Sequence, residues 1–234
     1  MSQPRLVEPE LLDHLPADDP RAVRSRQDLK RINAVMRHAG IMARALLAHS
    51  GGRRPSAIAD LGSGDGAFML RVAQRLAPQW SGVTVVLLDQ RDIVSAETRA
   101  AFAALGWTAE PVSTDVFSFL DNPGRPAVDI ITANLFLHHF EPDGLSRLFA
   151  RAADLAWLFV ACEPRRGTLG REASRLLWLL GCNDVSVHDA VASARAGFLG
   201  QELSALWPKR EGWNLHESGV ALLTHRFVAS RVKT

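Results

Sequence analysis

One short stretch of the sequence, residues 58–66 (IADLGSGDG), constrains what the chain can fold into. Its apolar residues lead directly into a turn with glycine at every second position, at Gly62, Gly64 and Gly66. Residues 67–76 follow with apolar side chains at the spacing of a helix that packs on a sheet. Glycine allows a sharp turn and lets a ligand approach without a Cβ in the way. The stretch predicts a strand, a ligand-binding loop and a helix whose first N–H groups are available to a polar ligand.

Glycine loops of this kind serve two classes of cofactor. Gly62, Gly64 and Ala67 fit the dinucleotide pattern G-x-G-x-x-G/A loosely, which keeps an NAD(P)-dependent oxidoreductase as an alternative. Asp60 together with Gly66 instead gives an acidic residue followed by x-G-x-G-x-G. This pattern resembles motif I of the class I S-adenosylmethionine (SAM)-dependent methyltransferases, in which acidic residues suit the positive methionine end of the cofactor. The resemblance implies a SAM-binding loop made by Asp60, Gly62, Ser63, Gly64 and Gly66.

The resemblance continues along the chain in the family's order. Residues 83–88 form a buried-strand pattern that ends in an acid, residues 113–117 contain the segment that meets adenine, and residues 128–140 resemble the fourth strand with its following loop. In this family the acid that ends the second strand, here Asp89, accepts hydrogen bonds from the ribose hydroxyls. The resemblance thereby assigns further cofactor-binding residues: Asp89, Gln90, Asp115, Val116 and Asn134.

Strand and helix patterns alternate from residue 58 to residue 162, which predicts a parallel sheet with helices on both faces. The resemblance implies an α/β, Rossmann-like, doubly wound fold with a seven-stranded, mostly parallel sheet and a reversed last strand. Residues 1–49 are expected to form an N-terminal helical cap of the same domain, in which residues 1–19 lie loosely on the surface. Gly40 is expected to divide the helical pattern of residues 20–49.

Residues 50–234 are assigned to the methyltransferase domain. A helical substrate insert is expected at about residues 165–212, with helices near 171–180, 187–196 and 201–207. A final hairpin follows it, with its turn at Ser218 and Gly219. The aromatic residues that we expect to line a substrate pocket are Trp178, Phe198, Trp207 and Trp213.

Composition bounds the function further. The 234 residues are 47% hydrophobic, enough for one large core. The 27 Lys and Arg against 25 Asp and Glu leave a net charge of only +2, so nucleic acid is not an expected partner. Cys162 and Cys182 form no disulfide framework, and no signal peptide or membrane span is visible, so we expect a cytoplasmic monomer or homodimer.

Histidines near the predicted cofactor loop are the candidates for catalysis. Methyl transfer requires the acceptor atom to be held against the methyl carbon, and a hydroxyl acceptor must also lose its proton. His138 and His139 directly follow the fourth strand, and His188 stands beside Asp189 in the insert. Histidine suits a general base because its pKa is near neutral. We favour His188, since Asp189 and Asp184 are placed to support its charged form.

The loop after the fourth strand narrows the substrate class. Residues 134–137 (NLFL) lack the prolines of the D/N-P-P-Y/F loop found in methyltransferases of nucleobases. The loop resembles instead those of enzymes that tailor small aromatic molecules in secondary metabolism. Asp129 and Asn134 are too isolated for a metal site, so none is expected. The sequence predicts SAM-dependent O-methylation of a small aromatic hydroxyl compound, with S-adenosylhomocysteine (SAH) as product; a non-methylating SAM-binding protein is the other alternative.

Overall fold

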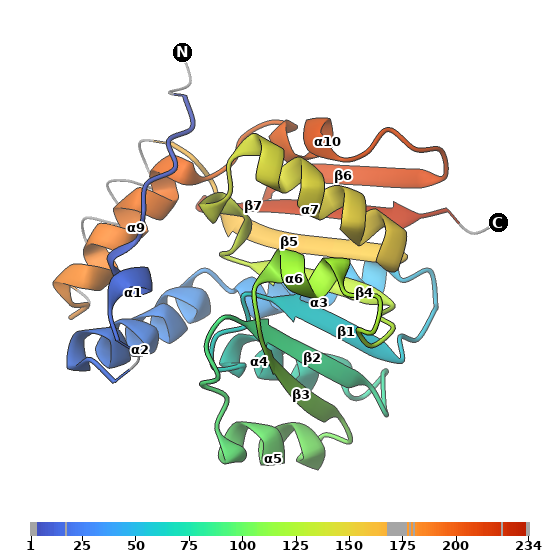
Figure 1. The fold of residues 1–234 in the computed structure, drawn as a ribbon, viewed down its shortest axis with the longest axis horizontal. Coiled ribbons are helices and arrows are strands. Elements are labelled where there is room, and N and C mark those ends of the chain that lie inside the picture. Colours follow the sequence, from blue (N-terminus) through green and yellow to red (C-terminus); the bar gives the residue numbers. More distant parts are fainter. Residues whose placement is uncertain are drawn as a thin grey trace.

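The computed structural model describes residues 4–16, 18–167, 177, 179, 181–220 and 222–232. Its centre is a seven-stranded sheet with the order β3-β2-β1-β4-β5-β7-β6 (Figure 1). The strands are β1 Ala57–Leu61, β2 Thr84–Asp89, β3 Thr108–Ser113, β4 Ile130–Asn134, β5 Leu158–Pro164, β6 Trp213–Val220 and β7 Thr224–Arg231. Strands β1 to β5 pair in parallel, and β7 runs antiparallel to both of its neighbours. The predicted sheet with a reversed last strand is confirmed.

Helices cover both faces of this sheet (Figure 1). They are α1 Leu11–His14, α2 Pro20–Val35, α3 His38–His49, α4 Ala67–Leu76, α5 Ala96–Ala104, α6 Val116–Asp121, η1 Leu137–His139, α7 Pro142–Leu155, α9 Asp184–Ala196 and α10 Glu202–Leu206. Helices α3, α4 and α5 share a buried core with one face, while α6, α7 and α10 share a core with the other. The fold is therefore doubly wound. Among the described residues, no helix combines the length and the apolar character that crossing a membrane requires.

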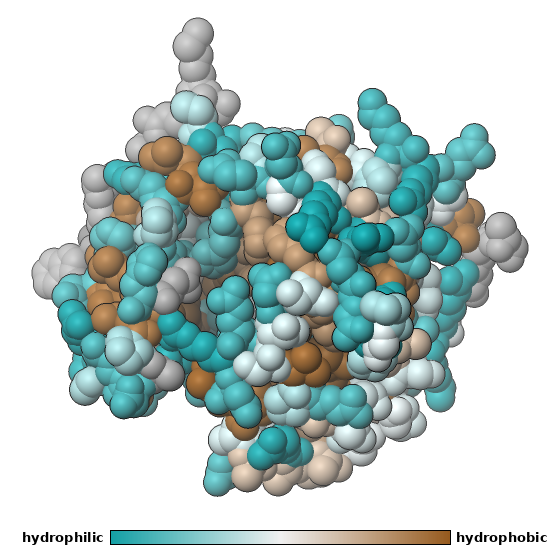
Figure 2. Space-filling model, viewed as in Figure 1, coloured by the Kyte–Doolittle hydropathy of each residue, from teal (hydrophilic) through white to brown (hydrophobic). Residues whose placement is uncertain are grey.

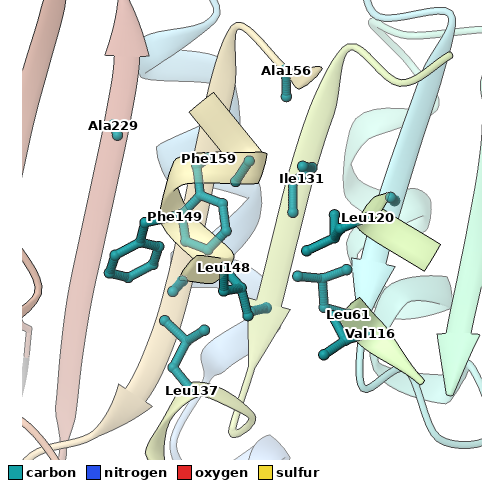
Figure 3. Packing of buried hydrophobic residues seen from close by; sticks show 14 of the residues in the cluster. Leu61, Val116, Leu120, Ile131, Leu137, Leu148, Phe149, Ala156, Phe159 and Ala229 are labelled. Carbon is teal, nitrogen blue, oxygen red and sulfur yellow. The ribbon is translucent and has the colours of Figure 1, made fainter. Parts of the chain in front are cut away.

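Successive side chains of a strand point to opposite faces of the sheet, so the central strands contribute side chains to both cores. Leu61 and Ile131 belong to the core under α6 and α7, where Figure 3 shows Leu61 beside Val116 and Leu120. Ile58, on the same strand as Leu61, belongs to the opposite core. Strands that are buried on both faces have continuous apolar sequences, which is why these strands were recognisable in the sequence.

The N-terminal helical pattern breaks earlier than predicted. Helix α2 ends at Val35 and α3 begins at His38, whereas Gly40 lies inside α3. The break occurs at Arg37, whose φ of 56° places it in the left-handed region that ends a helix. The prediction of a break at Gly40 is wrong because a glycine within a helix only weakens the helix and does not have to end it.

The final hairpin also differs from its prediction. Its turn includes Leu222 and Leu223, while Gly219 lies within β6 and pairs with His225 of β7. A Cβ at Gly219 would come within 3.0 Å of Arg165 Cζ, so glycine makes room there for a side chain. Gly219, which the sequence analysis assigns to a turn, is therefore explained by its close packing against Arg165.

The helical insert is described in part. The predicted helix at residues 171–180 lies mostly outside the described residues. Helix α9 begins before the predicted position, because Asn183 caps it by accepting a hydrogen bond from Ser186 N at 2.8 Å. Helix α9 packs against both α1 and α2 at one end of the sheet (Figure 1).

Candidate active site

A cavity of about 500 Å³ lies at the carboxyl ends of the central strands. Its lining combines the glycine loop after β1, the end of β2, the loop after β4, one side of α2 and Glu10 of the N-terminal segment. Figure 2 shows this face of the molecule, with hydrophobic residues visible between the helices on the left and the body of the sheet. Doubly wound sheets bind their ligands at this edge. The predicted cofactor residues that line the cavity are Asp60, Gly62, Ser63, Gly64, Asp89, Gln90, Asp115, Val116 and Asn134.

Glycine is needed at positions 62 and 66 of the loop for different structural reasons. A Cβ on Gly62 would lie 2.3 Å from Phe136 Cδ2, so this glycine allows the aromatic ring to close against the loop. Gly66 has a φ of 76° and a Cβ there would lie 2.9 Å from Leu87 Cδ1. Gly66 therefore faces the core under β2 and does not line the cavity, unlike the other loop residues predicted to bind the cofactor.

The acids that follow β2 and β3 are held by backbone groups. Asp89 Oδ2 accepts a hydrogen bond from Gly64 N at 2.9 Å, which ties the glycine loop to β2. Asp115 Oδ1 accepts hydrogen bonds from Phe117 N at 2.9 Å and Ser118 N at 3.1 Å, and so caps α6. Both carboxylates are fixed at the cavity wall before any ligand binds.

The end of β1 contains two buried polar groups with unusual surroundings. Asp60 is buried and accepts a hydrogen bond from Thr132 Oγ1 at 2.7 Å. Burial is the main reason why the pKa of Asp60 is raised to about 7; the hydrogen bond from Thr132 opposes this shift and the nearby charge of Asp89 adds to it. Ser63 Oγ is buried and has no hydrogen-bond partner in the described chain. A positive or hydrogen-bonding ligand group would satisfy both residues.

Asp60 should make the stability of the protein depend on pH. Its pKa of about 7 lies above the ordinary 3.8, so the stability linked to the protonated form is present below about pH 4 and is lost as the pH rises towards 7. Asp60→Asn keeps an oxygen for Thr132 but cannot ionise. We expect its free energy of unfolding, relative to that of wild type, to increase by on the order of 2 to 3 kcal/mol as the pH rises from about 5 to 7. Thermal unfolding at several pH values tests this. A difference in Tm that does not change with pH would contradict it.

The loop after β4 is organised by a buried carboxylate at the end of β5. Glu163 accepts hydrogen bonds from Phe136 N at 3.0 Å and Leu137 N at 2.9 Å. Its Oε2 lies 2.7 Å from His138 Nδ1. Leu135, which precedes this turn, has a φ of 53°, uncommon for a leucine and typical of constrained functional loops. Glu163 thus fixes both the short helix η1 and the ring of His138.

A second carboxylate holds the other side of the same ring. His138 Nε2 lies 3.3 Å from Glu10 Oε1, and Ser193 Oγ also donates to Glu10. Burial lowers the pKa of His138, but the hydrogen bonds and charges of Glu10 and Glu163 outweigh burial and raise it to about 9. His138 lines the cavity together with His139, but each of its ring nitrogens faces a carboxylate, so His138 is less well placed than His139 to accept a proton from a substrate.

The two remaining histidine candidates lie in different places. His139 is partly buried and lines the cavity, with its ring centroid 6.5 Å from that of Phe136. His188 does not line the cavity, and its side chain is 52% exposed. Asp189 lies 3.1 Å from His188 Nδ1, but its oxygens also accept hydrogen bonds from Leu11 N and Leu12 N. The structure therefore brings His139, not the favoured His188, to the cavity.

The N-terminal segment is anchored at the site rather than loosely placed on the surface. Arg5 Nη2 donates to His138 O at 3.0 Å and to Phe140 O at 2.7 Å, and Arg5 Nε donates to Ala196 O at 2.8 Å. Together with Glu10, Arg5 joins the loop after β4 to helix α9. The expectation of a loose segment is wrong because its polar residues find buried partners far away in the sequence.

A polar network ties the first helices to β4. Asn134 Nδ2 donates to Asn33 Oδ1 at 3.0 Å, and Asn134 Oδ1 lies 2.7 Å from His38 Nδ1. His38 Nε2 lies 2.9 Å from Thr224 Oγ1, and burial lowers the pKa of His38. In addition, Lys30 Nζ pairs with Asp65 of the glycine loop at 2.6 Å. Helix α2 is thereby fixed as one wall of the cavity.

Within the described residues, one group has the composition of a metal site. Glu10, His138 and His139 offer oxygen and nitrogen atoms within 4.8 Å of one another. Both ring nitrogens of His138 already face carboxylates, one from Glu10 and one from Glu163. The charged ring between two carboxylates accounts for this arrangement as a buried ion-pair network.

The sequence and fold were then compared with known proteins. No family model and no curated protein sequence matches the chain. An O-methyltransferase family protein from Burkholderia thailandensis shares 18% identity, over 92% of this chain and 61% of that one, with a TM-score of 0.59. The mitomycin 7-O-methyltransferase MmcR shares 19%, over 94% of this chain and 60% of its own, with a TM-score of 0.60.

A third solved structure matches over nearly the whole length of both chains. The plantazolicin methyltransferase BpumL, in complex with a monoazolic desmethylPZN analog and SAH, shares 14% identity over 91% of each chain, with a TM-score of 0.61. The present chain spans about three fifths of the length of the Burkholderia thailandensis protein. At these identities the likeness concerns the fold. The chain has the Rossmann-like fold of the class I SAM-dependent methyltransferases, as its motifs predicted.

Proposed function

We propose that this chain is a SAM-dependent methyltransferase that methylates a hydroxyl group of a small aromatic metabolite. The observation that carries the proposal is the gathering of the motif residues from β1, β2, β3 and β4 around one cavity. Methyltransferases are among its structural neighbours, including the mitomycin 7-O-methyltransferase MmcR, which supports the proposal. The acceptor is a small molecule, and the protein acts in the cytoplasm as a monomer or homodimer without nucleic acid.

The residues at the cavity fit SAM. Asp89 would accept hydrogen bonds from the ribose hydroxyls, Asp115 and Val116 would hold adenine, and the glycine loop would hold the methionine end. The unpaired hydroxyl of Ser63 and the buried Asp60 suit the polar, positively charged methionine group. When bound, SAM supplies an electrophilic methyl group on a positively charged sulfur.

The chain's own residues then position and deprotonate the acceptor. Phe136 and Phe140 provide an aromatic wall beside His139, with their ring centroids 5.0 Å apart. His139 would take the proton of the acceptor hydroxyl, which leaves an electron pair on the oxygen for the electrophilic methyl group that SAM would supply. Holding the two reacting atoms in line supplies the rest of the acceleration. The products are the methylated acceptor and SAH.

Asp89→Ala should weaken SAM binding by about 1 to 3 kcal/mol, because a ribose hydroxyl loses its acceptor. Isothermal titration calorimetry measures this directly. Asp121→Ala is the matched control, since Asp121 pairs with Arg147 and Arg151 and does not line the cavity. Equal SAM affinity in wild type and Asp89→Ala would contradict the assignment.

Two further measurements separate the alternatives. An NAD(P)-dependent oxidoreductase would be stabilised against heat by NAD or NADP and not by SAM. A non-methylating SAM-binding protein would be stabilised by SAM but would form no SAH with any acceptor. The proposed function requires stabilisation by SAM and formation of SAH.

A further inference from the structure

A second cavity of about 130 Å³ adjoins the cofactor cavity. We refer to it as the side pocket. The two cavities share lining residues from the N-terminal segment, α2, the loop after β4 and α9: Glu10, Leu12, Leu29, Leu135 and Ser193. The side pocket is therefore separated from the proposed reaction site by no more than these side chains. Leu135, whose unusual backbone conformation turns the chain here, faces both cavities.

The wall of the side pocket is largely apolar. Ile32, Met36 and Ala190 contribute apolar groups to its wall. Most polar side chains of its wall are held by other groups of the chain or are exposed: Ser186 Oγ donates to Asp28 Oδ2 at 3.0 Å, both Asp189 oxygens accept backbone hydrogen bonds, Arg31 pairs with Asp28, and Arg165 is exposed. A charged or hydrogen-bonding group would lose its water there without gaining a partner. The pocket therefore selects an apolar group.

The volume of the side pocket limits the size of the group that can bind in it. An apolar cavity of roughly 150 Å³ binds benzene, so a pocket of about 130 Å³ accommodates a short alkyl chain or a comparable group. Glu10 stands at the junction and is already paired with His138, and a carboxylate disfavours an acidic occupant. The chemistry at the junction and in the pocket thus favours a neutral, apolar substituent.

We infer that the side pocket is the subsite for an apolar substituent of the methyl acceptor. The acceptor is then amphipathic, with a hydroxyl-bearing ring beside His139 and Phe136 and a short alkyl substituent that passes Leu135 into the side pocket. This inference rests on the proposed function and specifies its substrate class as alkyl-substituted phenols.

The test is a series of para-alkylphenols from phenol to 4-butylphenol, assayed by SAH formation. Each methylene that enters the pocket should raise kcat/KM by about fourfold. Ala190→Phe fills the pocket from α9 at a residue that does not line the cofactor cavity, and should abolish this increase while leaving the value for phenol unchanged. Val191→Phe, which places the same side chain one residue along α9 outside both cavities, should retain the increase.

Binding of 4-butylphenol to the SAM-saturated protein, measured by calorimetry, provides a second readout. A kcat/KM independent of chain length, equal losses for phenol and 4-butylphenol in Ala190→Phe, or no binding of 4-butylphenol would each overturn the inference. Absence of SAM binding would instead overturn the proposed function, whereas SAM binding and SAH formation from phenol without any chain-length effect would overturn only the side-pocket assignment.

Discussion

Replacing His139 with alanine is expected to lower kcat for hydroxyl methylation by about 100- to 10,000-fold, the usual cost of losing a general base. SAM affinity should stay at the wild-type value, because the proposed cofactor contacts lie on other residues. The reason for choosing His139 is geometric: it lines the cavity, whereas both nitrogens of His138 face carboxylates. Steady-state kinetics with an alkylphenol acceptor, monitored by SAH formation, provide the measurement.

Two controls make this prediction specific. His188→Ala should keep near-normal kcat, since the exposed His188 lines neither cavity. Addition of EDTA should also leave turnover unchanged, because the ion-pair network of Glu10 and His138 needs no metal. A His139→Ala enzyme with wild-type kcat would show that the base lies elsewhere, and inhibition by EDTA would show that the group of Glu10, His138 and His139 binds an ion.

The fold could be predicted largely from local sequence patterns. Strands buried on both faces, such as β1, β2 and β4, give continuous apolar runs that end in an acidic or amide residue. The edge strand β3 gives no such pattern, because its residues are mostly partly or fully exposed and it contains Pro111. The predicted aromatic pocket is not found among the described residues: Phe198 and Trp207 are buried in a core and Trp213 packs against it, while Trp178 lies outside the described residues.

The residues predicted to bind the cofactor reach one cavity because they lie at or just after the ends of neighbouring strands, so order along the chain determines position in space. The rest of the site depends on long-range contacts that no local pattern encodes. Glu10 reaches His138, and Asn33 and His38 meet at Asn134. The neighbours His138 and His139 are the same residue type in the sequence. Both line the cavity in the folded chain, and the folded positions of Glu10 and Glu163 place a carboxylate against each ring nitrogen of His138.

That structural role leads to the prediction with the largest expected effect on stability. Glu163→Gln keeps an oxygen for Phe136 N and Leu137 N but removes the charge beside the buried ring of His138. Loss of one partner of a buried ion pair costs about 3 to 5 kcal/mol. The free energy of unfolding at pH 7, measured with urea, should fall by this amount. Because the pKa of His138 is raised to about 9, the wild-type advantage should be complete below about pH 6.5 and be lost as the pH rises through 9.

A matched buried pair separates stability from catalysis. Glu217 lies 2.7 Å from His225 Nε2 and accepts hydrogen bonds from Leu203 N and Ser204 N, so it organises α10 much as Glu163 organises η1. Glu217→Gln should therefore destabilise the protein comparably, yet it should keep kcat at temperatures where the protein is folded, because Glu217 does not line the cavity. Glu163→Gln should lose kcat as well, since η1 carries His139. Equal kcat in the two variants would show that the loop after β4 holds His139 without help from Glu163.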